Sequence, residues 1–134
     1  MARKVMIFGT FDGIHEGHRS LFKQARAYGE HLMVVVARDA TVMAVKGQMP
    51  RNDERRRVAD VAREECVVDA ALGNADDKHE VIRIHRPDVI CLGYDQNNFI
   101  DTLEKTLQDV GLHDTKIIRL KAYKPKVYKS SKIF

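Results

Sequence analysis

Residues 4 to 18 read KVMIFGTFDGIHEGH, and this stretch decides the fold. Its first five residues form a short apolar run that ends at Gly9, which is typical of a buried parallel strand. The segment that follows holds three glycines, at positions 9, 13 and 17, and two histidines, at positions 15 and 18. We therefore expect a strand, then a glycine-rich loop, then the start of a helix.

The remainder of the chain repeats the alternation of strand and helix. Short apolar runs predict four further strands, at residues 32–37, 67–72, 89–92 and 116–120. Patterns of 3–4 spacing predict helices at residues 18–28, which stop at Gly29 as a C-terminal cap, and at 53–65, 76–85 and 99–110. Right-handed crossovers between such strands predict an α/β fold, namely a Rossmann-like three-layer α/β/α domain with a five-stranded parallel sheet.

Length and composition narrow the class of protein. A chain of 134 residues has length for one hydrophobic core, so we expect a single domain over residues 1–134. The 44% hydrophobic and 31% charged residues are those of a globular protein. The longest apolar runs are far below the roughly 20 residues that cross a bilayer, and no signal-peptide pattern is present, so we expect a cytoplasmic protein without membrane contact.

The net charge of +4 favours an anionic partner. Because the basic residues are dispersed and no aromatic-basic stripe accompanies them, a nucleotide is the expected partner and a nucleic acid is not. Cys66 and Cys91 form no CxxC pair, so we expect both to be buried structural residues. The other histidines lack the glycine context and are expected at surface or helix-edge positions: His31, His79, His85 and His113.

The glycine-rich segment is neither of the two common phosphate loops. Its spacing differs from GxGxxG, and no Gly-Lys-Ser/Thr follows it. Instead His15 and His18 bracket Gly17 at a helix start, where unpaired backbone N–H groups and imidazole N–H donors are able to bind the same phosphate. The strand-end rule for parallel sheets adds the loops that start at Arg38, Gly93 and Lys121 to the expected site.

The run from Gly9 to His18 resembles the signature of the HxGH nucleotidyltransferase superfamily, which includes cytidylyltransferases and archaeal-type FAD synthases. The resemblance extends over most of the chain, through residues 37–42, Lys46-Gly47, Pro50, the 54–57 cluster, residues 93–96 and residues 128–133. In the last of these segments Lys129 stands where the family has a hydroxyl residue.

The resemblance assigns roles to individual residues. It implies five catalytic residues: His15, His18, Lys46, Arg57 and Ser131. It implies ten nucleotide-binding residues: Gly9, Thr10, Phe11, Asp12, Gly17, Arg56, Gly93, Asp95, Gln96 and Ser130. Three consecutive helical positions point in different directions, so at most two of Arg55, Arg56 and Arg57 face the ligand, and which of them do so stays open.

The resemblance further implies transfer of AMP or CMP from a nucleoside triphosphate to a phosphorylated acceptor, with release of pyrophosphate. A phosphomonoester has a second pKa of about 6 and is largely ionised at neutral pH, so no strong general base is needed. Mg²⁺, or another divalent cation, is expected mainly on the triphosphate, with Asp12 and Asp39 as candidates for a carboxylate contact and no dedicated protein metal site. A homodimer acting on small-molecule substrates is the expected assembly.

The motifs favour a FAD synthase-like reaction between ATP and FMN. A glycerol-3-phosphate cytidylyltransferase-type enzyme that uses CTP is the alternative within the superfamily. A nucleotide-binding module without turnover is the alternative from a different class, and both retained histidines argue against it.

Overall fold

A computed structural model describes residues 3–74, 79–93 and 100–121 of the chain. Five strands form one sheet in the order β3-β2-β1-β4-β5, and all neighbours are parallel. The strands are β1 (Lys4–Gly9), β2 (His31–Val36), β3 (Asp69–Leu72), β4 (Val89–Leu92) and β5 (Lys116–Arg119). The predicted five-stranded parallel sheet is therefore confirmed, with boundaries that shift by at most two residues.

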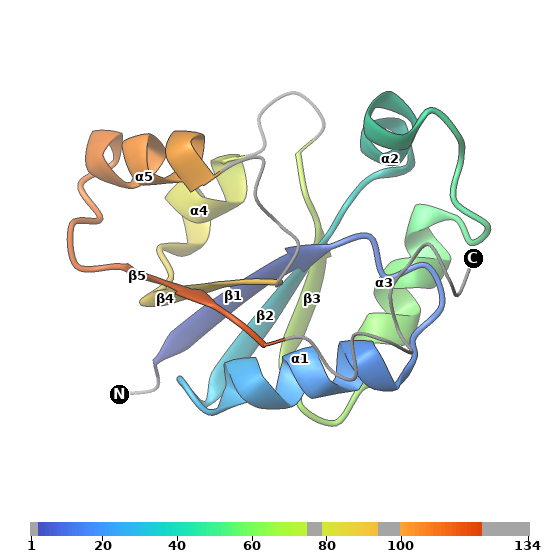
Figure 1. Cartoon of the computed structure of the whole chain (residues 1–134), viewed down its shortest axis with the longest axis horizontal. Helices are drawn as coiled ribbons and strands as arrows, with labels where there is room; N and C mark the ends of the chain where they lie inside the picture. Colours follow the sequence, from blue (N-terminus) through green and yellow to red (C-terminus); the bar gives the residue numbers. More distant parts are fainter. Residues whose placement is uncertain (1–2, 75–78, 94–99, 122–134) are drawn as a thin grey trace.

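The helices form the outer layers of the fold. They are α1 (Glu16–Arg26), α2 (Asp39–Lys46), α3 (Glu54–Ala62), α4 (Glu80–His85) and α5 (Ile100–Asp109). Figure 1 shows α1 and α3 on one face of the sheet, α4 and α5 on the other, and α2 beyond the end of β2. The predicted three-layer α/β/α arrangement is confirmed.

Alternate residues of the central strands belong to the two halves of the core. On β1, Val5 and Ile7 pack with Phe22 of α1, whereas Met6 packs on the opposite face with Leu103 of α5. Both sets are almost fully buried. Burial on both faces explains why the strands appear as continuous apolar runs and not as an alternation of apolar and polar residues.

The end of α1 differs from the prediction. The helix ends at Arg26 with Ala27 as its cap in right-handed conformation, so Gly29 is not the C-terminal cap. The backbone of Gly29 instead lies against the residue that precedes β1. A Cβ at this position would stand 2.6 Å from the carbonyl oxygen of Arg3. This glycine is required for close approach of two backbones and not for a helix cap.

Helix α2 was not predicted. Its eight residues bury only Val42, so the sequence lacks the apolar stripe that identifies a longer helix. The local signal for it is Gly47, which caps the helix at φ 78°. Lys46 is the last residue of this helix.

The strand order places a switch point between β1 and β4. Successive strands run from β1 to β3 on one side, and β4 and β5 lie on the other. In open parallel sheets, ligands bind outside the carboxyl ends of the strands at such a point. No helix within the described part of the chain is long and apolar enough to cross a membrane.

Candidate nucleotide-binding site

The loop after β1 is held by an aromatic side chain that turns back onto the sheet. Phe11 has a positive φ of 53° and is only 5% exposed. Its ring and that of His18 form a T-shaped contact at 5.2 Å between centroids, and it packs on Phe22 at 5.4 Å. A Cβ on Gly9 would stand 2.6 Å from the Phe11 Cζ atom, so the glycine makes room for this ring. Phe11 thus shapes the loop from inside the core.

His15 is the N-cap of α1 and closes a reciprocal pair of hydrogen bonds. The backbone N–H of Gly17 donates to His15 Nδ1 at 3.0 Å, and the backbone N–H of His15 donates to His18 Nδ1 at 3.3 Å. The two rings stack at 3.8 Å between centroids with an angle of 20°. The pair thus performs the role that Ser and Glu have in a standard capping box.

These bonds select one tautomer of each ring. A neutral imidazole that accepts through Nδ1 carries its proton on Nε2. His15 and His18 therefore each present an Nε2–H donor, side by side at the positive end of α1. Two neutral donors at a helix N-terminus suit an anionic phosphate oxygen.

The environment keeps both rings neutral near pH 7. Partial burial lowers the pKa of His15, and the positive charge of Arg19 lowers it further. Burial, followed by repulsion from His15 and Arg19, lowers the pKa of His18 to about 4. Arg19 itself is held by Glu16 at 2.6 Å and Glu64 at 2.9 Å, which keeps its charge beside the pair.

Asp12 fastens the loop after β1 to the segment that precedes α3. One carboxylate oxygen accepts the N–H of Arg51 at 2.7 Å, and the other accepts the N–H and the side-chain amide of Asn52, both at 2.9 Å. Burial alone would raise the pKa of Asp12, but these hydrogen bonds and the charge of Arg51 outweigh it and lower the pKa. The carboxylate is thus engaged with protein donors.

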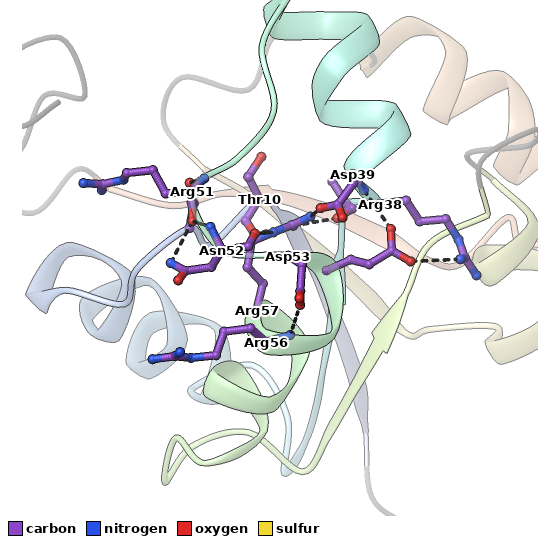
Figure 2. A network of polar contacts seen from close by, with 11 residues as sticks. Thr10, Arg38, Asp39, Arg51, Asn52, Asp53, Arg56 and Arg57 are labelled. Atoms are coloured by element: carbon purple, nitrogen blue, oxygen red, sulfur yellow. Dashed lines mark hydrogen bonds and ion pairs between the residues drawn. The ribbon is translucent and has the colours of Figure 1, made fainter.

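Arg57 is fully buried, which its predicted role as a phosphate contact did not anticipate. Its Nε donates to the Asn52 carbonyl at 3.0 Å, and Nη1 donates to the carbonyls of Thr10 at 3.0 Å and Ala37 at 2.6 Å. Its Nη2 pairs with Asp39 Oδ1 at 2.7 Å. Figure 2 shows this guanidinium between Thr10 and Asp39.

The first turn of α3 makes a second connection to α2. Glu54 accepts the backbone N–H of Asp39 at 2.9 Å and contacts Arg38 at 3.4 Å. Arg38 in turn donates to the carbonyl of Gly73, just beyond β3, at 2.6 Å. The start of α2 is therefore capped by a side chain from another helix, since Arg38 makes no side-chain cap of its own.

The other predicted site residues take no part in the hydrogen bonds described above. Lys46 is exposed, at the end of α2 that points away from Arg38. Arg56 is exposed and pairs with Asp60 at 3.3 Å. Gly93 is buried, and its carbonyl accepts from Arg119 at 3.0 Å. Four predicted residues lie outside the described part of the chain: Asp95, Gln96, Ser130 and Ser131.

The sequence points to the loop that starts at Arg38 and to the 54–57 cluster, but it assigns no role to three residues of this network: Arg38, Asn52 and Glu54. A signal was present in the spacing of Glu54 and Arg57, because residues three apart lie on one face of a helix. A buried arginine is uncommon, so the sequence favoured solvent or ligand for every arginine of the cluster.

Neither cysteine belongs to the site. Cys91 is fully buried in β4, and burial raises the pKa of its thiol to about 12, while Cys66 is half-buried. The predicted burial is confirmed for Cys91 and only partial for Cys66. Within the residues that the structure describes, no three His, Cys, Asp or Glu side chains gather in a way that would hold a metal ion.

Comparison with known proteins agrees with this geometry. The family model described as cytidylyltransferase-like matches residues 6–134. The chain is 34% identical to a FAD synthase from Picrophilus torridus, over 97% of this chain and 92% of that protein. It is 39% identical to a FAD synthase from Aciduliprofundum boonei, over 90% of this chain and 79% of that protein.

Solved structures show the same fold. The lipopolysaccharide core biosynthesis protein from Thermoplasma volcanium superimposes with a TM-score of 0.84 at 35% identity, over 92% of this chain and 99% of that one. A pantoate-beta-alanine ligase from Francisella tularensis, at 13% identity, TM-score 0.62 and coverage of 89% and 59%, shares the fold alone. The chain thus belongs to the cytidylyltransferase-like family within the HxGH nucleotidyltransferases, and it is a nucleotidyltransferase.

Proposed function

We propose that this nucleotidyltransferase transfers AMP from ATP to FMN and releases pyrophosphate. The observation that carries the phosphate-binding half of the proposal is the stacked pair of His15 and His18, which share one tautomer at the start of α1. The FAD synthases among the relatives supply the acceptor half.

The proposed reaction needs donors and not a general base. The phosphate oxygen of the acceptor attacks the α-phosphorus, and the bond from that phosphorus to the bridging oxygen breaks, so that the electron pair leaves with pyrophosphate. The Nε2–H groups of His15 and His18 donate to phosphate oxygens on which charge builds up. Such positioning and charge stabilisation dominate catalysis of phosphoryl transfer.

The cation in this scheme arrives with the nucleotide. Asp12 accepts three N–H donors and Asp39 pairs with Arg57, so neither carboxylate presents itself as a ligand. We therefore propose that the substrate is the Mg²⁺ complex of the triphosphate, with the metal held by phosphate oxygens and waters. Seven further residues remain proposed nucleotide contacts: Lys46, Arg56, Gly93, Asp95, Gln96, Ser130 and Ser131.

A matrix of substrates tests the proposal. Pyrophosphate release is measured with ATP or CTP against FMN or glycerol 3-phosphate, each with Mg²⁺. We expect release with ATP and FMN. Release with CTP and glycerol 3-phosphate alone would establish the cytidylyltransferase alternative, and nucleotide binding without release in any combination would indicate a binding module.

A further inference from the structure

Arg57 stands where two strand ends begin to separate. The ladder between β1 and β2 ends with Gly9 opposite Val36, and its last backbone bond runs from the Ala37 N–H to the Gly9 carbonyl at 2.9 Å. Beyond that bond the two segments diverge. The residues after Gly9 form the loop after β1, and the residues after Ala37 lead into α2. The Arg57 guanidinium donates to the first carbonyl on each side of this divergence, those of Thr10 and Ala37.

We propose that Arg57 is a positioning residue, which fixes the loop after β1 relative to the start of α2 and does not contact the nucleotide. The inference rests on the proposed function only in that the reaction is nucleotidyl transfer at this sheet edge. It does not depend on which nucleotide or acceptor is used.

Burial and donor use argue against direct contact with a phosphate. The side chain is 0% exposed, and hydrogen bonds to protein acceptors use four of its five N–H donors. To reach a ligand, the guanidinium would have to leave Asp39 and three carbonyl groups. An ion pair of this kind is costly to open, because each partner then loses its compensating charge.

The first turn of α3 also holds the start of α2 through a second side chain, that of Glu54. Glu54, three residues before Arg57, accepts the Asp39 backbone N–H, while Arg57 binds the Asp39 carboxylate. Asp39 is therefore fixed at both its backbone and its side chain by one turn of α3. Through Arg38, the same contacts extend to Gly73 at the end of β3.

The histidine pair at the start of α1, which we propose binds phosphate, is held independently of the Arg57 hydrogen bonds. His15 and His18 are held by hydrogen bonds within their own helix start, and neither bond involves α3. Loss of Arg57 should thus leave triphosphate affinity nearly unchanged while it disturbs the mutual placement of groups on the two loops. A misplacement of about 1 Å is able to lower a rate about 100-fold.

The test compares Arg57→Lys and Asp39→Asn with the wild type and with Arg63→Lys, a matched change at an exposed arginine that ends the same helix. Lysine retains the charge but lacks the planar fork that reaches three carbonyls and a carboxylate together. For Arg57→Lys we expect kcat to fall about 100-fold, with Kd for the Mg²⁺–triphosphate complex within about threefold of wild type. Asp39→Asn should shift kcat in the same direction, and Arg63→Lys should match the wild type.

Hydrogen exchange of the free protein separates positioning from general destabilisation, and it needs no substrate. Arg57→Lys should speed exchange in residues 9–13 and 37–42 and leave α4 and α5 unchanged. A Kd that weakens in proportion to kcat/KM, with unchanged exchange, would show a direct phosphate contact and overturn the proposal. Faster exchange throughout the chain, or an unchanged kcat, would also overturn it. If FMN is not a substrate, the kinetic arm uses the acceptor that turns over, and the exchange arm stands as it is.

Discussion

The imidazole rings of His15 and His18 lie face to face at 3.8 Å, and each accepts a backbone N–H through Nδ1. Each neutral ring therefore carries its proton on Nε2, which gives two Nε2–H donors at the start of α1. Replacing either histidine by alanine should lower kcat about 100-fold to 1000-fold, the usual cost of one donor to a developing oxyanion. Steady-state kinetics of His15→Ala and His18→Ala check this, with His113→Ala, an exposed histidine, as control.

A wild-type rate in both variants would contradict the donor role. A rate that falls in only one of the two variants would assign the phosphate contact to that histidine. The other histidine would then serve only to cap α1.

Acid should destabilise the protein through His18. Its pKa is lowered from 6.5 to about 4, so between these values the unfolded chain binds more protons than the folded one. The stabilisation from the neutral ring is therefore complete above pH 6.5 and decreases as the pH falls toward 4. Urea denaturation across pH 4 to 8 should show this slope in the wild type and a shallower one in His18→Gln.

Equal slopes in the two proteins would mean that His18 keeps an ordinary pKa in the fold. In that case a protonated ring, which cannot accept the His15 N–H through Nδ1, would be present at mildly acidic pH.

Asp12→Ala should destabilise the fold by about 1 to 3 kcal/mol, since it leaves the N–H groups of Arg51 and Asn52 without their acceptor. The kcat should fall too, because the loop after β1 loses its tie to the segment before α3. Thermal denaturation and kinetics check both effects. Asp114→Ala, a change at an exposed carboxylate, should alter neither.

Gly9→Ala should destabilise the protein by about 1 to 3 kcal/mol through overpacking, because its methyl group would collide with the buried Phe11 ring. The double variant with Phe11→Leu should recover part of that loss, since leucine is shorter in this direction. Gly73→Ala is the matched control, as its Cβ would meet only an ordinary contact of 3.4 Å with Val35. Additive losses in the double variant would contradict this account of Gly9.

The central strands could be predicted because burial on both faces produces apolar runs that need no tertiary information. The start of α1 was likewise visible in the spacing of His15 and His18. Helix α2 was not, since it buries only Val42 and its first turn is capped by Glu54 from another helix. Such a cap depends on tertiary contacts, which no local pattern records.

The burial of Arg57 was not predicted, for the same reason. Three adjacent arginines carry equal charge in the sequence, and only the packing of α3 on the strand ends shows that Arg57 is the buried one. The homodimer, the cytoplasmic location and the single domain over residues 1–134 stay predictions; sedimentation of the purified protein tests the dimer.

Transfer of label from ATP tests the central claim most directly. The protein is incubated with Mg²⁺, FMN and ATP labelled at the α-phosphorus, and the products are separated. The account predicts that label leaves ATP and appears in FAD, in equal amount to the pyrophosphate formed. Label that stays in ATP, although the protein binds the nucleotide and FMN is present in excess, would contradict the account.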